Sequence, residues 1–191
     1  MKAKNIIGYS AGILFFVISF FIDDLVFDKI SLFRNPLLDY ALGAVTHFGS
    51  VFIVLILMTT LFMWEERKRE WIPVLWTSFI ASTAICLILK SMIARPRPSE
   101  FTALIALTVH SFPSLHASAS FTAVPILDLE FPMFTWFWIL FAVIVGFSRI
   151  YLNVHYLSDV VGGALIGFAT AHLFVFIEKK YKLFRKVKLF K

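Results

Sequence analysis

Residues 133–177 read MFTWFWILFAVIVGFSRIYLNVHYLSDVVGGALIGFATAHLFVFI. The stretch contains two apolar runs, 133–151 and 157–177, and each approaches the roughly 20 residues that a helix needs to cross a bilayer. At and between the facing ends of these runs stand Arg149, His155 and Asp159. Charged side chains beside a membrane span are costly, so the stretch indicates a functional site as well as a pair of membrane helices.

The whole chain has the composition of a membrane protein. Of its 191 residues, 60% are hydrophobic and 17% aromatic, and the mean hydropathy is +0.85, which does not fit a soluble domain. The formal net charge is +6, but the excess of basic residues lies at the termini and in one short loop. This distribution argues against nucleic-acid binding and instead indicates membrane topology. The single cysteine, Cys86, leaves no partner for an intrachain disulfide.

Six apolar segments along the chain approach spanning length. They cover residues 6–22, 41–64, 72–94, 113–128, 133–151 and 157–177. The sequence therefore predicts an all-α integral membrane protein, a six-transmembrane-helix bundle formed by one domain over residues 1–191. The first segment is longer than the apolar core of a signal peptide and lacks a small-residue cleavage pattern, so we expect it to be retained. Residues 23–40 and 103–109 are predicted to lie at the membrane interface.

The fourth segment, residues 113–128, is the least apolar of the six. Its polar residues are Ser114, His116, Ser118, Ser120 and Thr122. We expect these side chains to face protein or water rather than lipid, because the bilayer core offers them no hydrogen-bond partner. The low apolarity of this segment is itself a sign of a site.

The basic residues outside the six segments predict the orientation of the protein. The N-terminal lysines, the run at 67–69 and the tail at 179–191 all fall on one side, which the positive-inside rule assigns to the cytoplasm. The opposite side receives the loop at 95–112 and the turn at 152–156. We therefore expect a multi-pass protein of the plasma or cell membrane, with its site on the extracytoplasmic face.

Lys90 and Arg97 form the first of three polar clusters on this face. The prolines at 96 and 98 stop the third helix, since each disfavours a helical conformation of the preceding residue and cannot donate a backbone hydrogen bond. Both cations are then presented at the membrane edge. Basic residues at helix ends commonly reach toward lipid headgroups, so this pair alone fits a structural role as well as a functional one.

The second and third clusters contain histidines. Pro113 suits the first position of a helix whose free amides could bind an anion, although Ser114 could simply cap the helix and His116 bond a neighbour. His155 and Asp159 share a face if the sixth helix begins early, and Asp159 could then hold one ring nitrogen and leave the other nucleophilic. The alternative is a surface histidine near a helix N-terminus. All three clusters lie on one side of the membrane, and this coincidence favours a single site.

The same residues form three ordered motifs. They are KSMIARPRP at 90–98, PSLH at 113–116 and SRIYLNVHYLSD at 148–159. In this order and at these spacings the chain resembles the type 2 phosphatidic acid phosphatase superfamily of membrane phosphatases, with a motif core over 90–159. The resemblance implies a six-helix core and a lipid phosphate substrate held among membrane lipids. It also implies chemistry without a metal or other cofactor.

The resemblance further implies a role for each motif residue. The implied substrate-binding residues are Lys90, Arg97, Ser114, Leu115 and Arg149. His155 attacks phosphorus to form a phosphohistidine, while Asp159 fixes the tautomer of the ring and stabilises its positive charge. His116 protonates the leaving group and then activates water to hydrolyse the intermediate.

Leu115 departs from the family pattern, in which most relatives have glycine. The variant PSLH is similar to that of some lipid phosphotransferases of the superfamily, so transfer to an alcohol is an alternative to hydrolysis. A non-catalytic scaffold or transporter is a further alternative, which the complete set of catalytic positions disfavours. Polyprenyl diphosphate, phosphatidic acid and phosphatidylglycerophosphate are the candidate substrates. The small, loop-poor chain leaves little room to recognise a large headgroup, which slightly favours the diphosphate.

Overall fold

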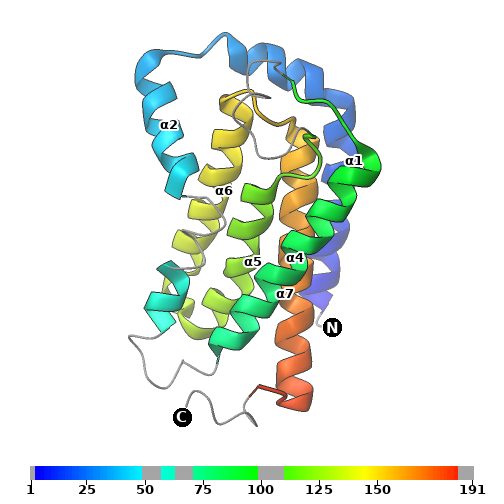
Figure 1. Cartoon of the computed structure of the whole chain (residues 1–191), viewed down its shortest axis with the longest axis vertical. Coiled ribbons are helices and arrows are strands. Elements are labelled where there is room, and N and C mark those ends of the chain that lie inside the picture. The colour runs from blue at the N-terminus through cyan, green and yellow to red at the C-terminus, as the bar shows by residue number, and fades with distance from the viewer. Residues whose placement is uncertain (1–2, 49–56, 63–70, 99–109, 185–191) are drawn as a thin grey trace.

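Helices make up nearly all of the chain that the structure describes, and no strand occurs in that part. The computed structural model describes residues 3–48, 57–62, 71–98 and 110–184. Its helices include α1 (Ala3–Ser31), α2 (Pro36–Phe48), α4 (Ile72–Ile93), α5 (Leu115–Glu130), the short 3₁₀ helix η3 (Pro132–Phe134), α6 (Thr135–Tyr151) and α7 (Leu157–Tyr181). Figure 1 shows the long helices side by side in a bundle. The prediction of an all-α fold is confirmed.

Four helical segments are long and apolar enough to cross a membrane. They are Gly8–Ser31, Ile72–Ile93, Pro132–Tyr151 and Leu157–Tyr181, with hydropathies between 1.8 and 2.1. The chain is therefore an integral membrane protein. The predicted segment 113–128 corresponds to α5, which has 16 residues, and the segment 41–64 lies partly outside the described residues. The count of six spans stays a prediction.

α5 lies at the centre of the bundle, in contact with α4, α6 and α7. Its polar Ser118, Ser120 and Thr122 are each at most 1% exposed. The Thr122 hydroxyl donates to the Ser118 carbonyl at 2.7 Å and lies 3.1 Å from the hydroxyl of Ser82 on α4. These polar residues of the least apolar segment therefore face protein, as we expected, and their burial explains why the segment need not be apolar.

Two glycines allow α7 to approach α5 closely. Gly163 and Gly167 lie one turn apart on α7, and a Cβ at either position would overlap the backbone carbonyl of Ser114 or of Ser118, respectively. Small residues at this spacing let membrane helices pack backbone against backbone. At the same end, the Ser114 amide donates to the Asp159 carbonyl at 3.0 Å. The first turns of the two helices are thereby joined.

α1 continues to Ser31, well beyond the predicted end of the first span at residue 22. The segment predicted to lie at the membrane interface begins inside α1, where Asp23 is 3% exposed and makes hydrogen bonds with Arg95 and Ser158. Its interfacial position stays a prediction. Figure 1 shows the last turns of α1 crossing the end of the bundle at which α6 joins α7. Partners within the protein therefore supply the hydrogen bonds that this buried carboxylate needs. The helix predicted at 103–109 lies outside the described residues.

Replacing Gly167 with alanine is expected to lower the free energy of unfolding by about 1–3 kcal/mol, because the new Cβ meets the Ser118 carbonyl and must separate two packed backbones. Gly43→Ala in α2 is the matched control, since a Cβ there meets nothing within 4 Å. That change should be neutral or should favour the helix. Thermal unfolding of both variants in the same detergent measures the difference, and equal midpoints would contradict the close packing at Gly167.

Candidate active site

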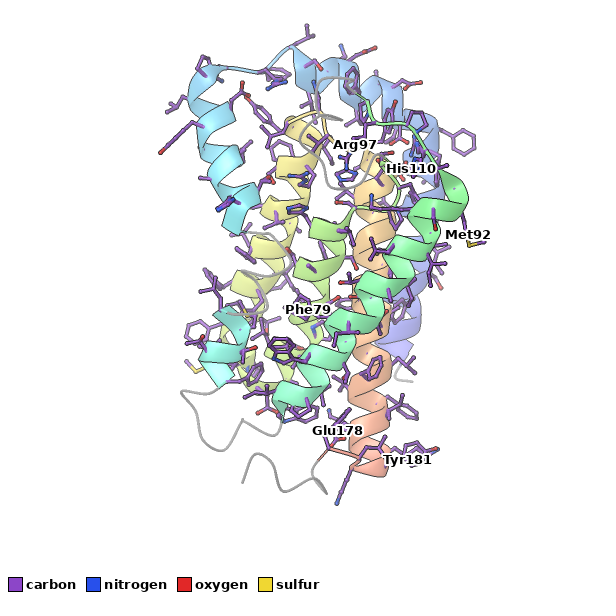
Figure 2. All side chains as sticks on the ribbon, in the orientation of Figure 1. Phe79, Met92, Arg97, His110, Glu178 and Tyr181 are labelled. Carbon is purple, nitrogen blue, oxygen red and sulfur yellow. The ribbon has the colours of Figure 1, made fainter. Side chains whose placement is uncertain are left out.

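The three predicted clusters meet at one end of the bundle. The end of α4 and the loop after it carry the first, the start of α5 carries the second, and the turn between α6 and α7 carries the third. Figure 2 shows Arg97 and His110 at this end. The ring of His116, the second residue of α5, lies within electrostatic range of four other predicted site residues. These are Arg149, His155, Arg97 and Lys90.

Lys90 is buried in the last turn of α4, with 3% of its surface exposed. Its Nζ donates hydrogen bonds to the carbonyl oxygens of His110, at 2.8 Å, and Ser111, at 3.0 Å. The helix ends at Ile93, and Ala94 then adopts a left-handed conformation with φ of 49°. The helix thus stops before the prolines, as predicted. Lys90 points to the segment ahead of α5 instead of reaching for lipid headgroups.

Arg97 lies against the turn between α6 and α7. Its Nη1 donates to the carbonyl oxygen of Val154 at 2.8 Å, so the guanidinium lies beside the residue that precedes His155. Burial lowers the pKa of Arg97, but a guanidinium remains charged at neutral pH. A cation from the first motif is therefore held next to the histidine of the third.

Arg149 occupies the last turn of α6 and is half-buried. Its carbonyl oxygen accepts hydrogen bonds from the amides of Val154 and His155, both at 3.2 Å. One residue of the turn has a left-handed backbone conformation. This residue is Asn153, with φ of 56°, and asparagine tolerates this conformation well. These features fold the chain back so that His155 returns to the level of Arg149.

Ser114 is the N-cap of α5, and its hydroxyl accepts a hydrogen bond from the Ala117 amide at 3.5 Å. The prediction that Pro113 holds the first helical position is wrong, because the helix begins at Leu115. Ser114 has an extended backbone, with φ of −72° and ψ of 116°, and its side chain satisfies an amide of the first turn. Ser114 is fully buried and Leu115 is half-buried. Capping is thus a role of Ser114, and its contact with a phosphate stays a prediction.

His155 and Asp159 are packed together, although they do not share a helix. α7 begins at Leu157 with Tyr156 as its N-cap, so His155 precedes the helix. Asp159 Oδ2 accepts the Tyr156 amide at 2.9 Å and lies 3.4 Å from Nδ1 of His155. The second distance exceeds that of an ordinary N–H···O bond, and Nδ1 makes no hydrogen bond to any described residue. The two groups are close enough for electrostatic interaction, but the expected hydrogen bond is not formed.

His155 is 3% exposed and has cations around it. Burial lowers its pKa well below the ordinary value of 6.5, and the charges of Arg149, Lys90 and Arg97 lower it further. The imidazole is therefore neutral at neutral pH. A neutral ring keeps a nitrogen lone pair that can attack an electrophile.

Sequence reasoning gave two residues of this network no role in the site, although it noted Arg95 among the basic residues of this face. Arg95 donates from Nη1 to Asp159 Oδ1 at 2.9 Å and from Nη2 to Asp23 Oδ2 at 2.8 Å. A signal for Arg95 was present, since it lies between Lys90 and Arg97 in the first motif. Asp23 gave a weaker signal, because a carboxylate that follows an apolar segment usually lies at the membrane interface.

The basic residues make this end of the bundle suitable for a multiply charged anion. Lys90, Arg97 and Arg149 come from three different segments, and the positive charge of each acts on the buried ring of His155. Cations held in a site of low water content bind phosphate oxygens strongly. Within the residues that the structure describes, no group of three or more His, Cys, Asp or Glu side chains could hold a metal ion.

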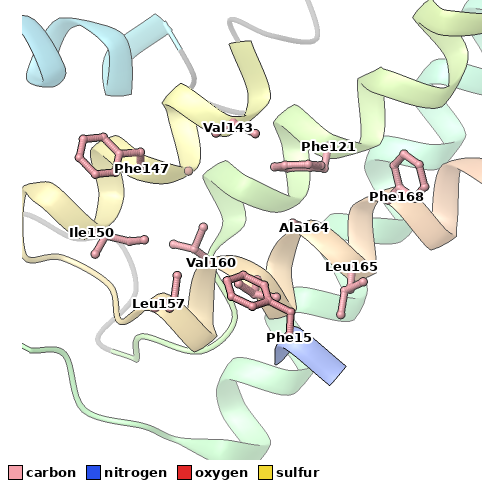
Figure 3. A pocket seen from close by; sticks show the side chains of 12 residues that line it. Phe15, Phe121, Val143, Phe147, Ile150, Leu157, Val160, Ala164, Leu165 and Phe168 are labelled. Atoms are coloured by element: carbon pink, nitrogen blue, oxygen red, sulfur yellow. The ribbon is translucent and has the colours of Figure 1, made fainter. Parts of the chain in front are cut away.

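An apolar cavity of about 450 Å³ adjoins the polar site. Figure 3 shows its walls, which come from α1, α5, α6 and α7 and include Phe15. Ile150 and Val160 line the cavity and are the chain neighbours of Arg149 and Asp159. The charged residues themselves do not line it. A polar site and an apolar cavity therefore lie side by side, as an amphiphilic ligand requires.

Comparison with known proteins gives matches over most of the chain. The model of the PAP2 superfamily matches residues 71–182. The chain is 29% identical over 177 residues to phosphatidylglycerophosphatase B of Bacillus subtilis, which covers 86% of this chain and 87% of that protein. It is 34% identical over 129 residues to an undecaprenyl-diphosphatase of Sulfolobus acidocaldarius, covering 63% of this chain and 62% of that protein.

A solved structure extends the likeness to the fold. The crystal structure of a PAP2 type phosphatidylglycerolphosphate phosphatase from Bacillus subtilis matches with a TM-score of 0.73 and 26% sequence identity. The match covers 92% of this chain and 98% of that one. It therefore includes most of the residues that precede the segment matched by the family model.

The unfolding temperature is expected to fall as the pH is lowered from about 7.5 to about 5.5, in part because of His155. The folded protein keeps this ring neutral, whereas the unfolded chain takes up a proton below the ordinary pKa of 6.5. The unfolded state then binds more protons, so the stability contributed by the neutral ring is lost as the pH falls below 6.5.

His155→Asn should lose fewer degrees than the wild type over this pH range, because asparagine does not titrate. His47→Asn, at an exposed position on α2, should lose as many as the wild type. Thermal unfolding in one detergent at several pH values measures all three proteins. An equal loss in His155→Asn and the wild type would contradict the lowered pKa.

Proposed function

Because the chain belongs to the PAP2 superfamily and is a phosphatase of the type 2 phosphatidic acid phosphatase kind, we propose that it hydrolyses a lipid phosphate or diphosphate at the extracytoplasmic face of the cell membrane. The gathering of three cationic residues around the buried His155 carries this proposal. Arg97 donates to the Val154 carbonyl, the Arg149 carbonyl accepts the His155 amide, and Lys90 donates to the Ser111 carbonyl ahead of α5. Polyprenyl diphosphate, phosphatidylglycerophosphate and phosphatidic acid are the candidate substrates. We favour the polyprenyl diphosphate, because the short loops offer few groups to recognise a large headgroup.

In this proposal the three basic residues hold the phosphate oxygens. They offset the charge of the bound substrate and the charge that spreads over the oxygens in the transition state. The bond from Arg97 to the Val154 carbonyl fixes one of them beside the nucleophile. The amides of Leu115 and His116, in the first turn of α5, have no acceptor within their own helix and add hydrogen-bond donors.

His155 is the proposed nucleophile. Its Nδ1 faces Asp159, so Nε2 attacks phosphorus, and the N–P bond forms as the P–O bond to the leaving group breaks. Asp159 stabilises the positive charge that the ring acquires. The protonated form of His116 donates its proton to the leaving oxygen. The ring then accepts a proton from the water that attacks phosphorus, as the N–P bond to His155 breaks. Inorganic phosphate leaves, and His155 returns to its neutral form.

The apolar cavity supports a lipid as the substrate. Its walls begin at residues adjacent in the chain to Arg149 and Asp159 and continue along α7 to Phe168. A headgroup at the basic residues would place the start of its hydrocarbon chain there, where burial of apolar surface contributes about 25 cal/mol per Å². A water-soluble phosphate ester lacks this contribution.

Transfer of the phosphoryl-linked group to an alcohol is a second candidate, favoured by Leu115. Hydrolysis and transfer share the attack by His155 and differ in whether water or an alcohol accepts the group. Leu115 begins α5 and precedes His116, the residue that activates the acceptor in our proposal. A leucine makes this edge of the site more apolar than a glycine would, which favours an alcohol over water.

His155→Ala is expected to lower phosphate release by at least about 1,000-fold, because it removes the nucleophile. The measurement is phosphate release by the purified protein from a panel of polyprenyl diphosphate, phosphatidylglycerophosphate and phosphatidic acid in detergent. His47→Ala, an exposed histidine of α2, should match the wild type. Full activity of His155→Ala would refute the assigned nucleophile, and loss of wild-type activity in excess chelator would refute chemistry without a metal.

The same panel separates hydrolysis from transfer when the lipid phosphate is labelled and an alcohol is added. Hydrolysis predicts that the label appears as free phosphate whether or not the alcohol is present. Label recovered in the alcohol, with little free phosphate, would establish transfer instead.

Ala164→Phe is expected to lower kcat/KM roughly tenfold for a long-chain polyprenyl substrate, because the phenyl ring fills the cavity that Ala164 lines. Its kcat/KM for a short, water-soluble phosphomonoester should stay within about twofold of the wild type, since such a substrate does not enter the cavity. Leu173→Phe is the control, as Leu173 is 55% exposed on the same helix and lies outside the cavity. Equal effects of Ala164→Phe on both substrates would rule out the cavity as the site of the lipid tail.

A further inference from the structure

Arg95 bridges two buried carboxylates at the candidate active site. Its Nη1 donates to Asp159 Oδ1 at 2.9 Å, and its Nη2 donates to Asp23 Oδ2 at 2.8 Å. Asp159 is completely buried, Asp23 is 3% exposed, and the side chain of Arg95 is 22% exposed. Charge-assisted hydrogen bonds of this length with little water access are among the stronger polar contacts in proteins.

Further contacts fix the orientation of this bridge. Asp23 Oδ1 accepts the Ser158 amide at 2.9 Å, and Oδ2 accepts the Ser158 hydroxyl. The Arg95 guanidinium lies 4.1 Å from the centre of the Tyr156 ring and 5.6 Å from that of Phe20. Aromatic rings at these distances attract a guanidinium and restrict its movement. α1 is therefore joined to both the loop after α4 and the first turn of α7.

The two arginines of the first motif face different groups. Arg97 donates to the Val154 carbonyl, on the side of the proposed phosphate site, whereas Arg95 is engaged by carboxylates. Both oxygens of Asp159 are occupied, because Oδ1 accepts from Arg95 and Oδ2 accepts from the Tyr156 amide. This arrangement determines how Oδ2 faces Nδ1 of His155, at 3.4 Å.

We propose that Arg95, held in place by Asp23 of α1, is a positioning residue that keeps the Asp159 carboxylate charged and aimed at His155. The inference rests on the proposed function, because it concerns the step in which His155 becomes positively charged. Arg95 acts through Asp159 and does not contact the phosphate. The family model matches residues 71–182, and Asp23 lies outside this segment. One of the residues that hold Arg95 in place therefore comes from outside the segment that the family model matches.

The test compares kcat and KM of purified variants on the lipid that the wild type hydrolyses best. Arg95→Gln is expected to lower kcat roughly 10- to 100-fold, as loss of an outer partner does at other tightly built sites, with KM within about twofold of the wild type. Arg95→Lys should recover part of the loss, because it keeps a cation beside Asp159. The control, Arg34→Gln, removes an exposed arginine paired with Asp39 at 3.2 Å and should leave kcat unchanged.

A double variant distinguishes positioning from a general structural role. If Arg95 acts through Asp159, Arg95→Gln combined with Asp159→Asn should be no slower than Asp159→Asn alone. Multiplied losses in the double variant would overturn the proposal. A raised KM with unchanged kcat in Arg95→Gln would do so as well, since it would make Arg95 a substrate ligand.

Folding is checked by thermal unfolding of each variant, because Arg95→Gln leaves two buried carboxylates without their cation. If that variant does not fold, Asp23→Asn answers the question, since it keeps the bond between Arg95 and Asp159 but weakens the hold on Arg95. It should lower kcat about three- to tenfold at unchanged KM, and a wild-type kcat would overturn the proposal. A wild type that hydrolyses none of the lipids refutes the proposed function and this inference together. An active wild type with an equally active, folded Arg95→Gln refutes this inference alone.

Discussion

The backbone contact between α5 and α7 determines where the groups of the site stand. The bilayer supplies no hydrophobic force to press helices together, so close packing and hydrogen bonds must do so. Gly163 and Gly167 remove the side chains that would separate the two helices, and the Ser114 amide bonds the Asp159 carbonyl at their shared end. His116 of the second motif and Ser148 of the third are 32 residues apart in the sequence. The contact nevertheless places the start of α5 beside the start of α7.

The balance of charge at this end is uneven, and the imbalance favours an anion. The cationic side chains of the site are Lys90, Arg95, Arg97 and Arg149, and its buried carboxylates are Asp23 and Asp159. Arg95 is paired with both carboxylates, whereas Lys90 and Arg97 donate to backbone carbonyl oxygens, which carry no full negative charge. Lys90, Arg97 and Arg149 therefore give this end of the described structure a net positive charge, which suits the phosphate of the proposed substrate.

The sequence was sufficient to place the three motifs at one end of a helical membrane protein, because topology determines which loops share a face. The start of α5 was harder to predict, because both Pro113 and Ser114 are residues that favour the beginning of a helix. Ser114 is the N-cap, so the helix begins at Leu115 and Pro113 precedes it. The buried position of Asp23 could not be predicted, because its partners lie far along the chain and leave no periodic pattern. The chemical role of each motif residue could not be predicted from spacing alone, because spacing places a side chain but does not determine its protonation state or its orientation.

The contacts of Asp23 also affect how the protein is made. Asp23 precedes Arg95 by 72 residues and Ser158 by 135 residues. Chains are synthesised from the N-terminus, so α1 enters the membrane while neither partner yet exists. During that interval the carboxylate lacks these partners, and its set of hydrogen bonds is complete only after Arg95 and then Ser158 have been translated. The contacts that hold α1 in place are therefore complete only once α7 has packed against it. A ribosome-bound fragment without α7 lacks Ser158 and Asp159 and cannot form the complete site.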